Sequence, residues 1–275
     1  MVSYASAPSL DRQRPYQPRA DRSLQISQQD DEWEAGKREH IALSNAAAAL
    51  YDESYESANF ATASYMNYEL EQLKQLVHQA KDRKIAVDLG CGTGRHSFAL
   101  AEHFDRVYGY DISPAMIENA NSVKKQSGIG NVLFEVADVE EEVPSIGAGR
   151  ADLVTCSFGM GSFIRDLPTL FKTVRILLKP GGVAAFSWYN QDAIVNSLSL
   201  PWQPALAARM VPGRRLLRVE FAGQVKEISA VAYSVGKLQH ELSMNFQEFR
   251  LSTYPTLTAL FPQELFTSAR AQELC

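Results

Sequence analysis

One stretch constrains the fold of this chain more than any other: Ile85-Ala-Val-Asp-Leu-Gly-Cys-Gly-Thr-Gly-Arg-His-Ser97. Residues 85–89 have the pattern of a short buried strand, glycine stands at positions 90, 92 and 94, and a helical pattern follows. Glycine allows the backbone to reach positive φ and allows a ligand to approach the main chain closely. A strand that leads into a glycine-rich loop and then a helix is typical of the nucleotide-binding start of a doubly wound sheet.

Two features of this stretch indicate which ligand it binds. A dinucleotide fingerprint has the pattern G-x-G-x-x-G, but Arg95 stands where its third glycine belongs. Asp88, near the end of the strand, would repel a pyrophosphate and attract a cationic ligand. S-adenosylmethionine (SAM) carries an ammonium and a sulfonium and no phosphate, and the segment 87–94 resembles the first motif of class I SAM-dependent methyltransferases. These features disfavour an NAD(P)-binding domain.

Further landmarks of this family follow in order. Asp111 ends a predicted strand over 107–112, about twenty residues beyond the glycine loop, the spacing at which an acid meets ribose hydroxyls. Asp138 ends a predicted third strand over 131–138, and Leu178-Lys-Pro-Gly-Gly182 precedes a predicted fifth strand over 183–188. Because these landmarks span residues 85–190, the chain is identified as a member of the class I superfamily, of the small-molecule type.

The resemblance implies SAM as cofactor, S-adenosylhomocysteine as product, and a set of residues that contact the cofactor. The residue after the ribose acid packs on the adenine, and the loop after the third strand reads the adenine amino group. The implied cofactor residues are Asp88, Gly90, Cys91, Gly92, Thr93, Gly94, Asp111, Ile112, Met116, Ala137, Asp138, Val139, Ser157 and Phe158. No metal site is predicted, since the cysteines at 91, 156 and 275 lack metal-binding or disulfide spacing.

The predicted architecture is a doubly wound, mostly parallel Rossmann-like sheet with a helical N-terminal lid and a β-rich insertion on the substrate side. Residues 1–30 are rich in Ser, Gln, Arg and Pro and are predicted to be a disordered tail. We expect a lid and a lead-in helix over 31–81, the SAM-binding core over 82–190, and a substrate-side cap over 191–275.

The predicted structure of the cap rests mainly on the alternation of apolar residues with other residues and on the positions of prolines. A short helix is expected over 206–210, and strands are expected over 216–235 and 237–251, where Leu238, His240, Leu242 and Met244 alternate with other residues. A helix is expected over 263–274. Family members often add one antiparallel edge strand there. Since the sequence stops at Cys275, either that strand is absent or a partner domain follows in a longer protein.

Methyl transfer is an in-line displacement that depends on proximity and on the exclusion of water. The sulfonium is already a strong electrophile, so a base is needed only if the acceptor must lose a proton. The catalytic residue therefore stays unassigned: His96 and His240 are weak base candidates, and a structural role is favoured for both. Tyr51 and Tyr55 are predicted lid residues, and Met160 and Tyr189 are predicted to contact the substrate.

The net charge and one missing motif limit the classes of acceptor that the chain could methylate. The net charge is −5, and the segment after the predicted fourth strand, Cys156-Ser-Phe-Gly159, lacks the Pro-Pro-aromatic motif of adenine or glutamine amino-methyltransferases. We therefore expect a small molecule or a short peptide and no nucleic acid. The sequence has no apolar run of membrane-spanning length and no apolar N-terminal signal, which predicts a cytoplasmic protein without membrane contact.

Two alternatives remain open at this point. One is the methyltransferase part of a natural-product tailoring protein that methylates a peptide carboxylate and is fused to a second enzyme. The other is a SAM-binding scaffold without catalytic activity.

Overall fold

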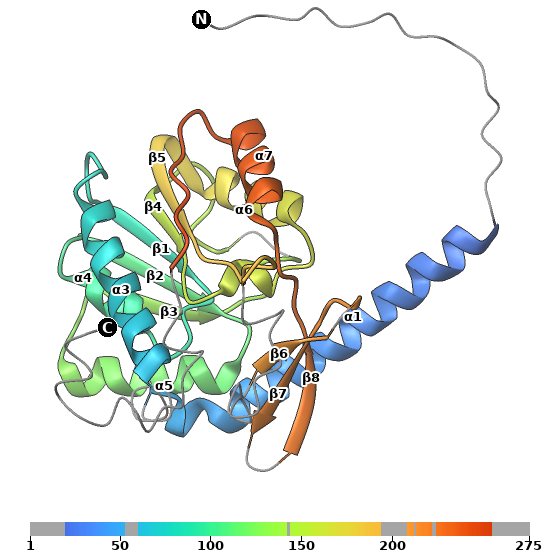
Figure 1. Cartoon of the computed structure of the whole chain (residues 1–275). Coiled ribbons are helices and arrows are strands. Elements are labelled where there is room, and N and C mark those ends of the chain that lie inside the picture. Colours follow the sequence, from blue (N-terminus) through green and yellow to red (C-terminus); the bar gives the residue numbers. More distant parts are fainter. Residues whose placement is uncertain are drawn as a thin grey trace, which may run out of the picture.

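The computed structural model describes residues 20–52, 60–141, 144–193, 208–211, 213–221 and 224–254 (Figure 1). Its centre is a five-stranded sheet in the order β3-β2-β1-β4-β5, in which all neighbouring strands are parallel. A separate antiparallel sheet contains β6, β7 and β8. The predicted fold class, a Rossmann-like α/β sheet with an N-terminal helix, is confirmed.

The elements have the following bounds. The central strands are β1 (Ile85–Leu89), β2 (Arg106–Asp111), β3 (Val132–Val136), β4 (Ala151–Cys156) and β5 (Leu178–Phe186). The small sheet consists of β6 (Ala208–Met210), β7 (Leu216–Phe221) and β8 (Gln224–Ser229). The helices are α1 (Ala20–Ala47), η1 (Ala48–Leu50), α3 (Phe60–Val77), α4 (Arg95–Ala101), α5 (Pro114–Ser127), η2 (Met160–Ser162), α6 (Leu167–Leu177) and α7 (Val235–Asn245).

Helices cover both faces of the central sheet, because successive side chains of a strand point to opposite faces. On β1, Ala86 belongs to the apolar cluster formed with α3, α4 and α5, whereas Val87 belongs to the cluster formed with α6 and α7. The chain runs from β1 through β2 to β3 and then returns to place β4 on the other side of β1. Open α/β sheets bind ligands at such a reversal, so a ligand-binding crevice is expected at the carboxyl ends of β1 and β4.

Local signals explain the helices nearest this crevice. The Ser113 side chain accepts a hydrogen bond from the Met116 amide and Pro114 occupies the first helical position, so α5 begins as predicted. Asp166 caps α6 in the same way through the Thr169 amide.

Helix α1 begins at Ala20, earlier than the expected start at about residue 31, so the prediction of a disordered tail over 1–30 is wrong for residues 20–30. The helix is fixed further along by Trp33, which is 1% exposed, and by close packing against β8. The Ser229 hydroxyl donates to the Trp33 carbonyl at 2.5 Å. Polar residues without apolar periodicity become helical here because a later part of the same helix is packed against the small sheet.

We expect Gly36→Ala to destabilise this packing. A Cβ at position 36 would lie 2.4 Å from the Ser229 Oγ and 2.8 Å from the Ser229 amide nitrogen. Since backbone cannot move aside cheaply, the free energy of unfolding measured in urea should fall by about 1–3 kcal/mol. Gly236→Ala, in α7 with no described atom within 4 Å of its Cβ position, is the matched control and should leave stability unchanged or raise it by up to about 1 kcal/mol. Equal effects of both substitutions would contradict the tight α1–β8 contact.

The cap region departs from its sequence-based prediction in three places. Residues 235–245 form helix α7 where strands were expected, because Leu238 and Leu242, four residues apart, are buried together while Met244 is 73% exposed. Residues 208–210 form strand β6 instead of part of a short helix. Strand β5 begins at Leu178, so the Pro-Gly-Gly segment lies inside the strand, beside a register irregularity near Ala151.

Residues 194–207 and 255–275, with the predicted helix over 263–274, lie outside the described residues. Among the helices that the structure describes, none has the length and apolar character needed to cross a membrane.

Candidate active site

The glycine loop after β1 is held against the end of β2. The amides of Gly90 and Cys91 both donate to the Tyr110 carbonyl, at 2.7 and 3.0 Å. Gly90 has φ 70°, and a Cβ there would lie 2.5 Å from the Met160 Cγ, so the predicted substrate residue Met160 packs directly on the loop. Gly92 has φ 53° and no described atom within 4 Å of its Cβ position. The main chain of the loop is therefore open on the side where a ligand would approach.

Asp111 is fixed against this loop. Its Oδ2 accepts from the Gly92 amide at 2.8 Å and its Oδ1 accepts from the Ser113 amide at 2.9 Å. Burial raises the pKa of the Asp111 carboxyl, and the two amides oppose that rise. Ile112 beside it is partly exposed, whereas Met116 is 3% exposed. An acid oriented in this way retains lone pairs for two ribose hydroxyls.

Asp88 points into the protein. It is 1% exposed, with its Oδ2 accepting from Ser97 Oγ at 2.7 Å and its Oδ1 from Thr155 Oγ1 at 2.9 Å. Desolvation raises the pKa of Asp88, and the nearby His96 and the two hydroxyls act in the opposite direction. The Asp88 carboxyl thus lies beneath the loop, and its direct contact with a ligand stays a prediction.

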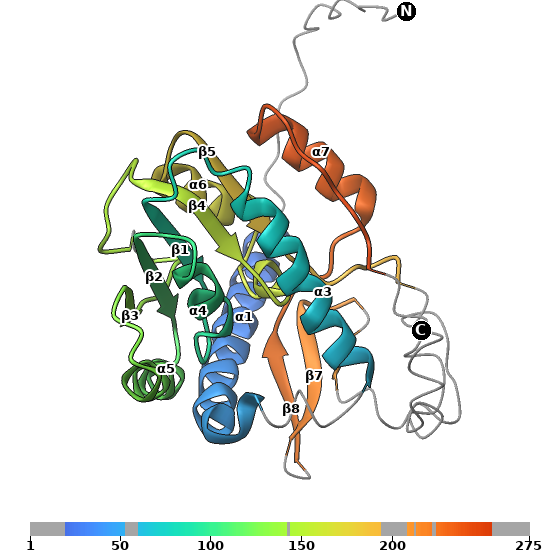
Figure 2. The same ribbon diagram turned by 90° about the vertical axis from the view of Figure 1, so that its left-hand side faces the viewer.

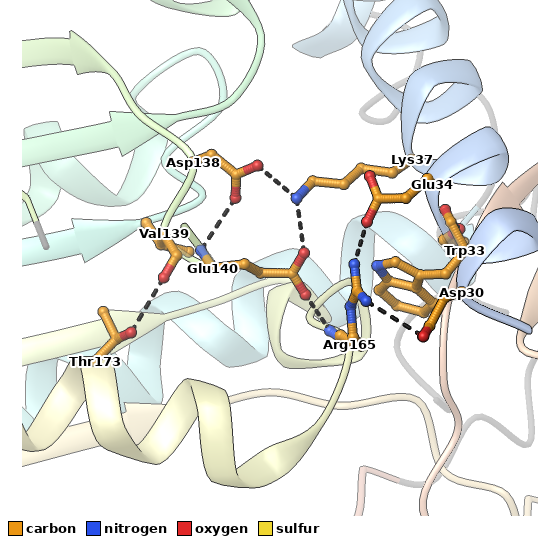
Figure 3. Close-up of polar contacts among 10 residues, drawn as sticks. Asp30, Trp33, Glu34, Lys37, Asp138, Val139, Glu140, Arg165 and Thr173 are labelled. Atoms are coloured by element: carbon orange, nitrogen blue, oxygen red, sulfur yellow. Dashed lines mark hydrogen bonds and ion pairs between the residues drawn. The ribbon is translucent and has the colours of Figure 1, made fainter. Parts of the chain in front are cut away.

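The acid predicted to read the adenine, Asp138, is paired with α1 (Figure 3). Lys37 Nζ lies 2.5 Å from Asp138 Oδ2 and 2.7 Å from Glu140 Oε2. Burial opposes the charge on Lys37, but the two carboxylates outweigh it and hold the pKa of Lys37 above its usual value. The side chain of Glu140 is 6% exposed, so water reaches little of this ion pair.

Glu140 and α1 are linked a second time through Arg165, in the segment between η2 and α6. The Arg165 amide donates to Glu140 Oε1, and the Arg165 guanidinium pairs with Glu34 and, at 3.3 Å, with Asp30 (Figure 3). Ala137 and Val139, the neighbours of Asp138 that were also predicted to contact the cofactor, are 8% and 6% exposed.

The C-terminal end of α1 and η1 continue across the carboxyl edge of the sheet, as the blue ribbon in Figure 1 shows. Asn45 Oδ1 accepts from Ser113 Oγ at 2.7 Å, and the Asn119 side chain donates to the Ala48 carbonyl at 2.6 Å. Thr93 Oγ1 of the glycine loop donates to Asp52 Oδ1 at 3.0 Å. The segment 30–52, which we call the lid, thus contacts the core from the β3 loop to the glycine loop. The predicted lid residue Tyr51 is part of it, and Tyr55 lies outside the described residues.

Helix α3 brings a polar cluster to the carboxyl ends of β4 and β5, on the other side of the glycine loop. The two carboxylate oxygens of Glu69 each lie 2.9 Å from the Phe158 amide, which donates to them, and Tyr65 OH donates to Glu69 Oε1 at 2.7 Å. Tyr65 OH also lies 2.5 Å from Ser187 Oγ. His96 Nε2 lies 3.6 Å from Glu69 Oε2.

Aromatic rings surround this cluster. Tyr65 lies with its ring centroid 5.7 Å from that of Phe158 and 5.5 Å from that of Tyr254. Tyr189, a predicted substrate residue, packs edge-on against Phe163 at 5.6 Å. Figure 2 shows α3 in front of the central sheet with α1 and the small sheet below it. Aromatic side chains at this edge can bury an organic acceptor.

The structure does not bring every predicted residue to the crevice. His240 is exposed on α7, whose buried residues pack in the cluster that contains Phe171 of α6, and no described contact links it to the glycine loop. Sequence reasoning also missed functional candidates, namely Lys37, Asn45, Asp52, Tyr65, Glu69 and Ser187. The available signal was the i, i+4 spacing of Tyr65 and Glu69, which places two polar side chains on one helix face next to the predicted cofactor strand.

The site fits the chemistry of SAM. The open main chain at Gly92 leaves room for a ligand, and Asp111 beside it keeps lone pairs that could accept from ribose hydroxyls. Asp88, Glu69 and Asp52 supply carboxylates around the loop, which suits a ligand with a sulfonium and an ammonium. Gly90, Gly92 and Asp111 are the residues that would hold it.

Comparison with known proteins is consistent with this geometry. A family model described as "Methyltransferase domain" matches residues 80–228, more than half of the chain. The chain belongs to this methyltransferase family. This match confirms the class I methyltransferase prediction, and with it SAM as the methyl donor of the family.

Two curated proteins are similar in sequence to part of this chain. It is 30% identical over 148 residues to the "Probable S-adenosylmethionine-dependent methyltransferase CRG1" of Saccharomyces cerevisiae, covering 52% of this chain and 50% of that protein. It is 33% identical over 109 residues to a "Ubiquinone biosynthesis O-methyltransferase" of Coxiella burnetii, covering 40% and 45%. The chain thus matches about half the length of these relatives or less.

Solved structures show the same fold. The DhpI–SAM–HEP complex superposes with a TM-score of 0.56 at 21% identity, covering 75% of this chain and 87% of that one. A SAM-dependent methyltransferase from Clostridium acetobutylicum gives a TM-score of 0.53 at 18% identity, covering 72% and 86%.

Proposed function

We propose that this protein transfers the methyl group of SAM to a small-molecule or short-peptide acceptor by in-line displacement. The observation that carries the proposal is the lid: Lys37, Asn45 and Asp52 contact the core at Asp138, Ser113 and Thr93, so the lid crosses the carboxyl edge of the sheet. An acceptor that reaches this edge beneath the lid has to be small. One relative is named as an O-methyltransferase of ubiquinone biosynthesis, which supports including hydroxyl compounds among the acceptors tested.

The protein promotes methyl transfer mainly by positioning the cofactor and the acceptor and by excluding water. When bound, SAM supplies an activated methyl group on a positively charged sulfur. Asp111 and the Gly92 amide fix the sugar end, and the lid covers the site, which keeps water away from the reacting atoms. Tyr65, Phe158 and Tyr189 form the aromatic wall against which the acceptor packs.

A labelling experiment tests the proposal. The protein is incubated with methyl-labelled SAM and a panel of phenols, amines, carboxylic acids and short peptides, and products are identified by mass spectrometry. We expect label in a small acceptor and the demethylated cofactor in equal amount. Heat of binding with SAM but no transfer to any acceptor would favour a binding scaffold, and heat with NADH but none with SAM would overturn the proposal.

A further inference from the structure

His96, on the first turn of α4, is a buried group that the function described above does not use. It is 8% exposed, and its Nε2 is fully buried without a hydrogen-bond partner among the described residues. The nearest acid is Glu69, whose Oε2 lies 3.6 Å from Nε2, just beyond hydrogen-bonding distance. A buried ring nitrogen left unpaired is costly, so its retention beside a carboxylate needs an explanation.

The position of His96 beside Glu69 determines which of its two ring nitrogens carries the proton. Tyr65 OH and the Phe158 amide both donate to Glu69, so this carboxylate acts purely as an acceptor. A lone pair on Nε2 would be repelled by Glu69 Oε2, whereas a proton on Nε2 is attracted to it. The neutral ring therefore carries its proton on Nε2, which leaves Nδ1 as the basic nitrogen.

The position of the pair is also specific. The Phe158 amide, just after β4, donates a hydrogen bond to Glu69, and Tyr65 contacts Ser187, just after β5. His96 follows the glycine loop after β1. The pair thus lies at the carboxyl ends of β1, β4 and β5, where the methyl donor and the acceptor should meet.

We propose that His96 is the general base of methyl transfer, that Glu69 is the residue that positions it, and that the acceptor carries an O–H or N–H group whose proton leaves on methylation. This inference rests on the proposed function. The acceptor's oxygen or nitrogen forms its bond to the methyl carbon, and the sulfur keeps the electron pair of the bond that breaks. The acceptor's proton moves to Nδ1 of His96 and later leaves to water. The imidazolium formed in this step faces Glu69, and the 3.6 Å gap would close as the charge develops.

The charged and titratable groups around this imidazole come from three elements. Glu69 and Tyr65 belong to α3, Asp88 to β1, and Arg95 precedes His96 on α4. The proposed base thus has acidic side chains beside it on two of these elements, α3 and β1. A peptide carboxylate or another acceptor that is already ionised would not need this base.

The first test is His96→Gln. The glutamine amide can donate toward Glu69 as Nε2–H does, but it cannot accept the proton. We expect kcat to fall about 10²–10⁴-fold with a phenol or amine acceptor, while SAM affinity by calorimetry and the melting temperature stay close to those of the native protein. His78→Gln, at an exposed position before β1, is the control and should keep full activity. Equal kcat for His96→Gln and the native protein would overturn the inference without touching the proposed function.

The second test needs no turnover. Nitrogen chemical shifts of the His96 ring in the cofactor-free protein report which nitrogen carries the proton. We expect the Nε2–H tautomer in the native protein and a shift toward Nδ1–H in Glu69→Gln, together with a smaller loss of kcat than in His96→Gln. A native ring protonated on Nδ1 would overturn the inference even if no acceptor in the panel were methylated. The absence of any methylated acceptor would count against the proposed function instead.

Discussion

Asp111→Ala should weaken SAM binding by at least about 10-fold, which corresponds to about 1.4 kcal/mol. The carboxylate accepts from the amides of Gly92 and Ser113, and is also the group predicted to bind the ribose. Its removal would cost the hydrogen bonds to the sugar and would also leave the Gly92 amide without its acceptor, so that the loop is less well ordered before binding. Calorimetric titration with SAM and with S-adenosylhomocysteine measures the effect.

The matched control is Asp105→Ala, which removes the same charge from an exposed position just before the other end of β2. Its SAM affinity should equal that of the native protein. Asp111→Asn, which keeps one acceptor oxygen, should give an intermediate affinity. Native affinity in Asp111→Ala would refute the assignment of Asp111 to the ribose.

Lys37→Met should detach the lid and lower the free energy of unfolding by about 2–4 kcal/mol, because it leaves Asp138 and Glu140 as two close carboxylates without a cation. The side chains of Lys37 and Glu140 are only 12% and 6% exposed, so water does not replace the lost contact. Urea denaturation gives the total loss, and hydrogen exchange of the amides in residues 30–47 shows whether the lid opens first.

Lys74→Met is the control for this substitution. Lys74 pairs with Glu71 at 2.7 Å, but their side chains are 56% and 63% exposed, so the free energy of unfolding should stay unchanged within experimental error. The contribution of Lys37 also depends on pH. Because its pKa in the folded protein is raised, the stabilisation is complete below the usual value of 10.5 and is lost as the pH rises through the folded pKa. Equal losses in the two lysine variants would contradict the role of the buried pair.

Much of the core could be predicted from the sequence because its signals are local. The glycines at 90 and 92 take positive φ, Ser113 and Pro114 begin α5, and Asp111 lies at the loop that its spacing indicated. Each of these depends on a few neighbouring residues, so a short window of sequence contains the whole signal.

The lid and the cap could not be predicted in this way. The pairing of Lys37 with Asp138 joins distant parts of the chain, and nothing near either residue indicates it. Helix α7 was misread because Leu238 and Leu242 fit both an alternating strand and a helix. The Ser234 side chain, which accepts from the Lys237 amide, was the local signal that favours the helix.

The lid contacts have a consequence for the order of events in each turnover. Lys37, Asn45 and Asp52 all bind core residues next to those assigned to the nucleoside part of the cofactor. We therefore expect the cofactor to enter and leave only while these contacts are broken, whereas the methylated acceptor need not wait for the same opening. The enzyme should take up its donor first and release the demethylated cofactor last, so that turnover is slowed by accumulated coproduct more than by accumulated product.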